Sequence, residues 1–307
     1  MSLSDSFTLT TEDGALLQAS GFRARSPRAV VVMAGGTGIP RQFYRHFAAC
    51  LAGRGLHVIT FDYRGKHSAV AAERLRMADW GRQDLDAVLA HASQRFPELP
   101  LLFVGHSVGG QIFGLARHSA QVQAALLIAS QSGYWRHWPG AWRWRRWLDW
   151  HLLMPAMTRL VGELPGWMLG GKPLPAGISK EWARWCRSPH YLCERDGAPM
   201  RDHFARLRLP MRFYGISDDA GLAPLAAVRA LMGFYPVAGK ELQVLTPADA
   251  GVAGLGHFGV FRESARVLWP PMVEWLLASL STREPRRGRH EAENIMPVAV
   301  CRGAPKQ

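Results

Sequence analysis

The stretch that most constrains the fold of this chain is residues 100–116, PLLFVGHSVGGQIFGLA. An apolar run typical of a buried strand is followed by a glycine-rich turn and then by a helix that we expect to begin near Val108. The turn reads GHSVG and fits the pattern G-x-S-x-G, in which a serine stands between a strand and a helix. Side chains at Gly105 and Gly109 would collide in so tight a turn, so both positions require glycine. The segment therefore predicts a nucleophilic Ser107 at the end of a strand.

Length and composition allow one large domain or a domain with an inserted cap. The chain has 307 residues, of which 48% are hydrophobic, and this is ample for a core. The net charge of +13 would suit nucleic acid or an anionic membrane. The basic residues, however, are spread along the chain, and neither an RNA-binding signature nor zinc-finger spacing occurs. We therefore expect an arginine-rich solvated surface and no nucleic-acid partner.

The N-terminal residues and the cysteines indicate a cytoplasmic protein. The chain begins MSLSDSFTLTTEDG, which has neither the basic nor the apolar region of a signal peptide, and no apolar run reaches transmembrane length. The four cysteines form no C-x-x-C pair and no Cys/His cluster with metal spacing: Cys50, Cys186, Cys193 and Cys301. We expect free thiols and no zinc site, with a Cys186–Cys193 disulfide as the alternative.

Eight predicted strands alternate with helices along most of the chain. The strands are expected at residues 6–11, 15–25, 29–33, 57–61, 101–104, 122–129, 209–214 and 241–245. Helices are expected at 42–54, 79–96, 111–118, 225–234 and 263–280, the last with a bend at its two adjacent prolines. A turn between the first two strands favours an antiparallel pair, whereas apolar strands separated by helices are typical of a parallel sheet covered on both faces. The predicted fold class is α/β, with a mostly parallel eight-stranded sheet flanked by helices.

A different pattern begins after residue 130. Nine of the twelve tryptophans fall between Trp135 and Trp185, and prolines divide this part into short helical segments without a regular strand. We interpret residues 131–205 as a helical cap inserted between the sixth and seventh strands. The core then comprises residues 1–130 and 206–281. Residues 282–307 lack periodicity and are expected to form a disordered tail.

Three polar groups follow the carboxyl ends of predicted strands, where the loops of a parallel sheet converge. Ser107 is followed in the chain by Asp218 or Asp219 and then by His257. In such a triad the serine attacks an acyl carbon, the histidine takes up and returns the proton, and the aspartate fixes the imidazole tautomer. Spacing back from Pro224 favours Asp219 as the acid, whereas spacing forward from the strand favours Asp218. We prefer Asp219 and keep Asp218 as the alternative.

Two backbone amides are candidates for binding the oxyanion of an acyl-transfer intermediate. The helix that begins at Val108 presents an unpaired amide beside Ser107. The loop AGGTGIP at 34–40 follows the third strand and lacks the lysine of a phosphate-binding loop, so we expect its Gly36 amide to be the second donor. Each such donor stabilises the transition state by about 3 kcal/mol. His106 should point away from the serine and support the turn, since alternate residues face opposite ways.

Taken together, these residues give a chain that resembles the α/β-hydrolase superfamily, and within it the predicted bacterial hydrolases of the serine-aminopeptidase and monoacylglycerol-lipase branch. The motifs that carry the resemblance are GGTGIPRQFYRHFA at 35–48, FDYRG at 61–65, DWGRQDL at 79–85, GHSVGGQ at 105–111, QSGYW at 131–135, EWARWCRSP at 181–189, SDDAGLAP at 217–224 and GHFGVF at 256–261. The resemblance implies a Ser/Asp/His hydrolase without metal or organic cofactor. In three places the chain departs from the family pattern: His67 replaces a glycine, Ala34 replaces a histidine, and the SDDAGLAP loop is one residue longer.

The composition of the cap points to an apolar substrate. Trp142, Trp144, Trp147 and Trp150 are interleaved with arginines. This pattern suits arginine stems packed on indole rings, and it also suits contact with a membrane interface. We favour packing and keep peripheral membrane contact as the alternative. In either case the pocket roof is apolar, so we expect hydrolysis of an ester or thioester with an apolar acyl group, through an acyl-enzyme.

Two other functions stay open. A serine aminopeptidase would need an acidic group in the cap to hold the substrate ammonium, and Glu163, Glu181 and Glu194 are candidates. A non-catalytic ligand- or membrane-binding protein on the same fold would have no need of an activated serine, which argues against it. Haloalkane dehalogenases and epoxide hydrolases resemble this fold but need a carboxylate where Ser107 stands. No feature of the sequence indicates an oligomeric state.

Overall fold

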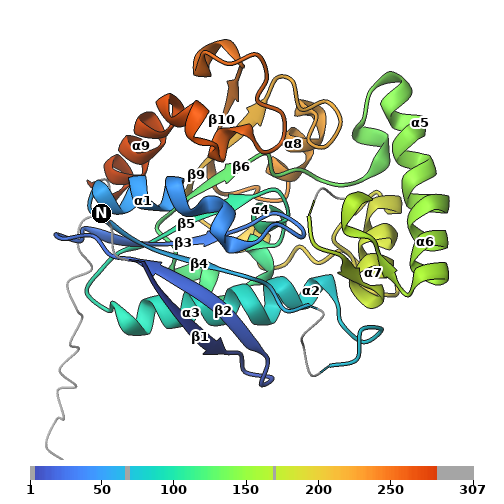
Figure 1. The fold of residues 1–307 in the computed structure, drawn as a ribbon, viewed down its shortest axis with the longest axis horizontal. Helices are drawn as coiled ribbons and strands as arrows, with labels where there is room; N and C mark the ends of the chain where they lie inside the picture. The colour runs from blue at the N-terminus through green and yellow to red at the C-terminus, as the bar shows by residue number, and fades with distance from the viewer. Residues whose placement is uncertain (1–3, 66–69, 169–170, 282–307) are drawn as a thin grey trace, which may run out of the picture.

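The computed structural model describes residues 4–65, 70–168 and 171–281, and its centre is an eight-stranded sheet. The strand order is β1-β2-β4-β3-β5-β6-β9-β10 (Figure 1). The strands are β1 (Ser4–Thr10), β2 (Leu16–Phe22), β3 (Ala29–Ala34), β4 (Leu56–Phe61), β5 (Leu101–His106), β6 (Ala124–Ile128), β9 (Pro210–Ile216) and β10 (Gly239–Leu245). β2 pairs antiparallel with both β1 and β4, and every other pairing in this sheet is parallel. The prediction of an α/β fold with a mostly parallel eight-stranded sheet is therefore confirmed.

The three central strands are buried along their whole length. Every residue of β3, β5 and β6 is buried, as their continuous apolar runs predict, because helices cover both faces of a parallel sheet. The register places Ala34 at the end of β3 opposite Gly105 of β5, and His106 opposite Ile128 of β6. The carboxyl ends of these strands therefore meet at one edge of the sheet, where Ser107 follows β5.

Helices lie on both faces of the sheet. α1 (Arg45–Gly53) and α9 (Trp269–Ser281) lie on one face, and α3 (Asp86–Arg95) lies on the other (Figure 1). The short α2 (Met77–Asp79) leads into α3 through a π-helical turn at Trp80–Leu85. α8 (Leu225–Met232) connects β9 to β10. The helices expected at 42–54, 79–96 and 225–234 are therefore present, with small shifts of their ends.

The helix expected at 111–118 does not form. α4 (Val108–Gln111) ends after one turn, and the chain continues in 3₁₀ segments at Phe113–Leu115 and Arg117–Gln121. Several glycines weaken the helix here. Gly114 also packs directly on Phe204, since a Cβ at Gly114 would lie 2.4 Å from that ring. Tertiary packing thus overrides the helical pattern of the sequence.

The C-terminal helix is shorter than expected. The sequence predicts one helix at 263–280 with a bend at the prolines, whereas α9 begins at Trp269 and follows a 3₁₀ segment, Glu263–Leu268, with non-helical Ala265. Pro270 and Pro271 lie in the first turn of α9, where proline removes no helical hydrogen bond. The prolines therefore begin the helix and do not bend it.

The segment between β6 and β9 forms a helical layer at one end of the sheet (Figure 1). α5 (Gly140–Leu148) continues through a π-helical turn at Asp149–Leu153 into α6 (Met154–Val161), and α7 (Ala176–Arg187) packs against α6. Pro155 closely follows the π-helical turn inside this continuous helix, and the helix break expected at this proline does not occur. A short pair, β7 (Glu163–Leu164) and β8 (Leu174–Pro175), was not predicted, because two residues per strand are too few for a periodic pattern.

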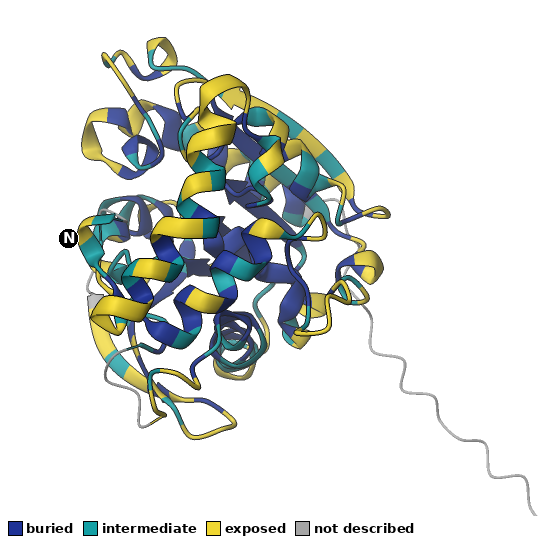
Figure 2. Ribbon diagram, turned by 90° about the vertical axis from the view of Figure 1, so that its right-hand side faces the viewer, coloured by how far each residue is buried: buried dark blue, intermediate teal, exposed yellow. Residues whose placement is uncertain are grey.

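The outer surface of this cap is partly apolar. Figure 2 faces the cap and shows many exposed positions along its helices. Trp144, Leu160 and Trp167 are largely exposed, whereas Trp150 and Trp185 are buried. The cap tryptophans thus divide between internal packing and the surface. None of the helices in the described part of the chain has the length and apolarity needed to span a bilayer.

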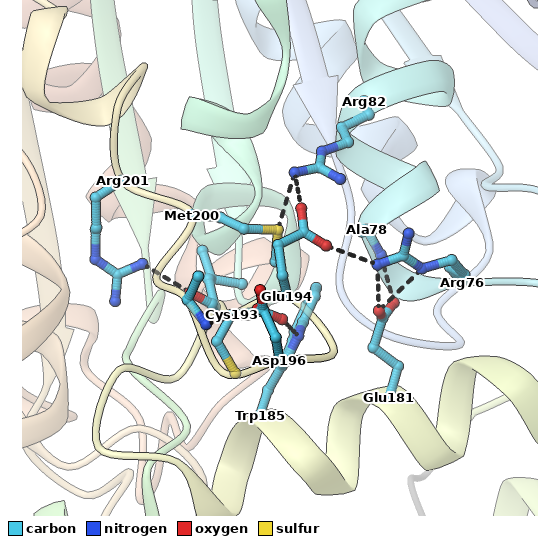
Figure 3. Close-up of polar contacts among 12 residues, drawn as sticks. Arg76, Ala78, Arg82, Glu181, Trp185, Cys193, Glu194, Asp196, Met200 and Arg201 are labelled. Carbon is cyan, nitrogen blue, oxygen red and sulfur yellow. Dashed lines mark hydrogen bonds and ion pairs between the residues drawn. The ribbon is translucent and has the colours of Figure 1, made fainter.

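Ion pairs join α7 to the core (Figure 3). Arg76, just before α2, pairs with Glu181 of α7 at 2.9 Å and with Glu194 at 3.3 Å. Glu181 also accepts a hydrogen bond from the Ala78 amide at 2.9 Å, and Arg82 pairs with Glu194 at 2.5 Å. Because Glu181 is buried and bound through both oxygens, this cluster fixes α7 against α2.

The structure tests the prediction on the cysteines but not those on the domain boundaries, on His67 or on residues 282–307. Cys50, Cys186 and Cys193 are free thiols, so the alternative Cys186–Cys193 disulfide is wrong. The division into a core and a cap at residues 131 and 205 stays a prediction. His67 and the tail at 282–307 lie outside the described residues.

Candidate active site

Ser107 occupies the tight turn between β5 and α4. Its backbone has φ 52° and ψ −118°, a conformation that residues with a side chain rarely adopt. The flanking glycines are required, as the sequence predicts. A Cβ at Gly109 would lie 2.2 Å from the carbonyl oxygen of Ala34, and a Cβ at Gly105 would lie 2.6 Å from the backbone of Gly110. The strand and the helix therefore approach so closely that the serine is held at the tip of the turn.

His257 and Asp219 form a buried hydrogen-bonded pair. Asp219 follows β9 and His257 follows β10, so the two side chains come from neighbouring strand ends. Nδ1 of His257 lies 2.5 Å from Oδ2 of Asp219, and both side chains are buried. A carboxylate only accepts hydrogen bonds, so Nδ1 carries a proton, and in the neutral imidazole Nε2 is the acceptor. This tautomer is the one that a histidine needs to act as a general base.

Asp218 contacts the backbone of the histidine loop and not the imidazole. Its Oδ2 accepts a hydrogen bond from the Leu255 amide at 2.8 Å, and its Oδ1 accepts one from the Gly256 amide at 3.0 Å. Asp218 therefore holds the loop that carries His257. Of the two aspartates that the sequence leaves open, the structure brings Asp219 to the histidine.

The two amides expected to bind an oxyanion differ in their surroundings. The amide of Val108, at the start of α4, has no hydrogen-bond acceptor among the described residues and stays a candidate donor. The amide of Gly36, in contrast, donates to the hydroxyl oxygen of Tyr44 at 2.7 Å. This corrects the prediction for Gly36, because an amide bound to Tyr44 is not available to a substrate. Tyr44 stands outside the glycine-rich loop, so the loop sequence alone gives no sign of this contact.

A buried chain of hydrogen bonds continues from Tyr44. The Tyr44 hydroxyl lies 2.8 Å from Nδ1 of His106, and Nε2 of His106 lies 2.9 Å from the carbonyl oxygen of His257. Because a carbonyl only accepts, Nε2 carries the His106 proton and Nδ1 accepts the hydroxyl proton of Tyr44. Burial lowers the pKa of His106 well below its usual value, so the imidazole is neutral. His106 thus supports the site from behind.

Thr37 is a cavity residue that no sequence motif points to. It lines the same cavity as Ser107 and His257. Its Oγ1 is buried and has no hydrogen-bond partner in the part of the chain that the structure describes. Buried hydroxyls normally have a partner, so this unpaired one is a candidate contact for a ligand. The only sign in the sequence is that Thr37 is the one hydroxyl residue of the AGGTGIP loop.

Ser107 and His257 line a cavity of about 610 Å³ between the core and the cap. This volume suits a small organic ligand. The cap contributes a mainly apolar lining: Trp138, Trp150, Leu153, Met154, Met157, Leu164, Trp167, Met168 and Trp182. Arg145, Arg146 and Asp149 are the charged cap residues of this lining, and Arg146 pairs with Asp149 at 2.9 Å. The cavity can therefore hold an apolar group beside the serine.

The glutamates considered for an aminopeptidase lie elsewhere. Glu181 and Glu194 are engaged by arginines at the contact of α7 with α2 (Figure 3). Glu163 is not part of the cavity lining. Within residues 4–65, 70–168 and 171–281, no three His, Cys, Asp or Glu side chains cluster in a way that could hold a metal ion.

A family model described as "Serine aminopeptidase, S33" matches residues 25–182, just over half of the chain. The chain belongs to this family of α/β hydrolases. A monoacylglycerol lipase of Mycolicibacterium smegmatis is 33% identical to this S33 family member over 106 residues, which make up 33% of this chain and 37% of the lipase. The match thus covers well under two thirds of that relative.

Solved structures share the fold of this S33 family member at low sequence identity. A soluble variant of the Saccharomyces cerevisiae monoglyceride lipase, in complex with a substrate analogue, has a TM-score of 0.63 and 14% identity, over 91% of this chain and 96% of that one. A Pyrococcus furiosus esterase has a TM-score of 0.58 and 16% identity, over 90% of this chain and 93% of that one. These likenesses confirm the α/β-hydrolase fold, which by itself is compatible with many reactions.

Proposed function

We propose that this chain is a serine hydrolase that cleaves a carboxylic ester or thioester with an apolar acyl group. The observation that carries the proposal is the buried His257–Asp219 pair, which shares a cavity with Ser107 in its strained turn. Asp219 holds the imidazole in the tautomer that leaves Nε2 ready to accept the serine proton. Asp218 is a positioning residue, since it holds the loop of His257.

The first half of the reaction acylates the serine. Oγ of Ser107 attacks the acyl carbon while Nε2 of His257 takes up the serine proton, and the substrate carbonyl oxygen becomes an oxyanion. The Val108 amide and the Thr37 hydroxyl donate hydrogen bonds to this oxygen. His257 then gives its proton to the leaving alkoxide or thiolate as its bond to the acyl carbon breaks.

The second half of the reaction releases the acid. Water attacks the acyl carbon of the acyl-enzyme, and its proton passes to Nε2 of His257. The bond between the acyl carbon and Oγ of Ser107 then breaks, and His257 returns the proton to the serine. The products are a carboxylic acid and the alcohol or thiol of the first step.

An ester with an apolar acyl group suits this cavity better than the ammonium group of a peptide. Methionine and tryptophan side chains form most of the cap lining and adapt to an irregular apolar group. Arg145 and Arg146 would repel a cation, and the lining carboxylate, Asp149, is already paired with Arg146 at 2.9 Å. The lipase relative supports an ester over a peptide, although only part of its length is matched.

Labelling with a fluorophosphonate probe, read by intact-mass spectrometry, tests the proposal. We expect one adduct on the wild type and none on Ser107→Ala or His257→Ala. His190→Ala, a change at an exposed histidine, serves as the matched control and should label like the wild type. Acyl p-nitrophenyl esters and an amino-acid p-nitroanilide, assayed side by side, then separate an esterase from an aminopeptidase. An unlabelled but folded wild type would contradict the proposal and favour a ligand-binding protein.

We also propose that the cap touches an anionic membrane surface and that the protein is cytoplasmic. Trp144, Leu160 and Trp167 expose apolar surface on the cap, beside the exposed arginines Arg145 and Arg159. Apolar side chains flanked by arginines bind the interface of anionic bilayers. The free, buried thiols of the cap support a reducing compartment.

A further inference from the structure

Two nitrogen atoms of cavity-lining residues are buried and lack a hydrogen-bond partner among the described residues. One is Nε of Arg146, and the other is the indole Nε1 of Trp150. The Trp150 residue is only 6% exposed. Both atoms are obligate donors. A buried donor costs free energy unless an acceptor pairs with it. Both nitrogens have almost no accessible surface, so a ligand in the cavity supplies this acceptor when the Arg146 and Trp150 side chains shift toward it.

The two donors lie close together on the cap. Arg146 belongs to α5, and Trp150 follows four residues later in the π-helical turn, so both side chains lie on one side of the helix. Cζ of Arg146 lies 6.0 Å from the centre of the Trp150 ring. Asp149 occupies another nitrogen of the guanidinium, Nη2, at 2.9 Å and leaves Nε unpaired. A single group could therefore accept hydrogen bonds from both residues.

We propose that Arg146 and Trp150 bind an anionic group, a carboxylate or a phosphate, carried by the substrate. This inference rests on the proposed function and deepens it, because it names the substrate class. The substrate is an ester or thioester whose apolar chain bears an acidic group remote from the bond that is cleaved.

The charge of the lining favours an anion over a neutral acceptor. Arg145 and Arg146 outnumber the carboxylate of Asp149, so these three side chains leave a positive charge in a mainly apolar cavity. Hydrogen bonds from a guanidinium to an anion are roughly twice as strong as those between neutral groups. An acyl chain without a polar end would cover both donors and leave them unpaired.

The test compares matched esters on wild type and variants. The probes are mono-p-nitrophenyl esters of linear dicarboxylic acids of increasing length, the corresponding methyl esters, and a phosphonate analogue of equal length. We expect kcat/KM for the best acidic ester to exceed that of its methyl ester about tenfold. This ratio should fall to near one in Arg146→Gln. It should also fall several-fold in Trp150→Phe, which removes the indole N–H and keeps an aromatic ring.

A matched variant controls for the positive charge of the cap. Arg195→Gln removes an exposed arginine that follows α7 and does not line the cavity, and its ratio should equal that of the wild type. Calorimetric titration of Ser107→Ala with the free dicarboxylate and with the phosphonate measures binding without turnover and shows which anion is preferred. If Arg146→Gln does not fold, the kcat/KM ratio of Trp150→Phe and this titration test the anion site in its place.

The outcomes separate this inference from the proposed function. Equal kcat/KM for acidic and methyl esters at every length, or an unchanged ratio in Arg146→Gln and Trp150→Phe, overturns the anion site and leaves the hydrolase proposal standing. A wild type that hydrolyses none of the esters and does not react with the fluorophosphonate probe overturns the hydrolase proposal itself.

Discussion

Nε2 of His106 lies 2.9 Å from the carbonyl oxygen of His257, although 151 positions of the chain separate the two residues. One end of the His106 ring thus holds the histidine loop, and the other end accepts the hydroxyl proton of Tyr44, which in turn holds the Gly36 amide. The loops after β3, β5 and β10 are therefore joined through one neutral imidazole. We expect the serine turn, the glycine-rich loop and the histidine loop to keep their relative positions as one unit.

The first prediction concerns acid stability and follows from this imidazole. Burial lowers the pKa of His106 well below 6.5, so the folded protein keeps it neutral where the unfolded chain protonates it. The unfolded state then binds more protons, and stability present above pH ~6.5 is lost as the pH falls, by at most about 1.4 kcal/mol per pH unit. Urea unfolding at pH 7.5 and 5.5 should show a smaller loss in His106→Gln than in the wild type. His190→Gln is the control, and equal losses in all three proteins would refute the prediction.

The neighbouring aspartates should give opposite phenotypes. Asp219→Asn removes the carboxylate that fixes the His257 tautomer, so kcat should fall by about 10³- to 10⁴-fold with little change in melting temperature. Asp218→Asn loses one of two backbone amides held by the carboxylate, so it should lower the free energy of unfolding by about 1–3 kcal/mol and reduce kcat much less. Steady-state kinetics and thermal unfolding of both variants check this. If Asp218→Asn lost more kcat than Asp219→Asn, Asp218 would be the acid of the triad and Asp219 the residue that positions the loop.

The glycines of the serine turn should not tolerate alanine. A Cβ at Gly109 would lie 2.2 Å from a backbone carbonyl oxygen, which side-chain adjustment cannot relieve. We expect Gly109→Ala to destabilise the fold by more than about 3 kcal/mol. Gly53→Ala is the matched control, because Gly53 is exposed at the end of α1 and a Cβ there meets nothing within 4 Å. That change should be neutral or stabilise by up to about 1 kcal/mol. Chemical denaturation of both variants measures the difference, and a stable Gly109→Ala would show that the turn is looser than described.

The hydroxyl of Thr37 should matter for the rate and not for substrate binding. Thr37→Val keeps the shape of the side chain and removes the donor, so kcat should fall about 10- to 100-fold while KM changes little. Thr37→Ser retains the hydroxyl and should recover most of the rate. Ester kinetics of the pair test the assignment. If Thr37→Val is as active as the wild type, the second donor to the oxyanion is a backbone amide and not the Thr37 hydroxyl.

The exposed face of the cap should bind vesicles. Replacement of Leu160 and Val161 of α6 by serine removes apolar surface, so co-sedimentation with anionic liposomes should fall several-fold, and wild-type binding should weaken with salt. Leu16→Ser is the control. Leu16 is also exposed, at 67%, but it lies on β2 and therefore outside the cap, whereas Leu160 is 80% exposed on the cap. Equal binding by the double variant and the wild type would speak for a cap that only covers the cavity.

The sequence carries the framework of the site more clearly than its details. The apolar strands and the GHSVG turn predict where Ser107 stands, because burial and close packing leave few other solutions. The choice between Asp218 and Asp219 depends on the direction of two side chains in one turn, which spacing does not define. The contact of Gly36 with Tyr44 depends on how the next helix packs over the loop. The unpaired nitrogens of Arg146 and Trp150 appear only when the cap covers the core.

The backbone of Ser107, with φ at 52°, is a conformation that glycine adopts without strain. Holding a serine there costs of order 1–3 kcal/mol. Ser107→Gly would therefore be expected to fold at least as well as the wild type while losing its nucleophile. If only thermal stability mattered, glycine would be the better residue at this position. Serine here lowers the stability of the fold and provides the nucleophile, so substitutions meant to raise the melting temperature should be made at other positions.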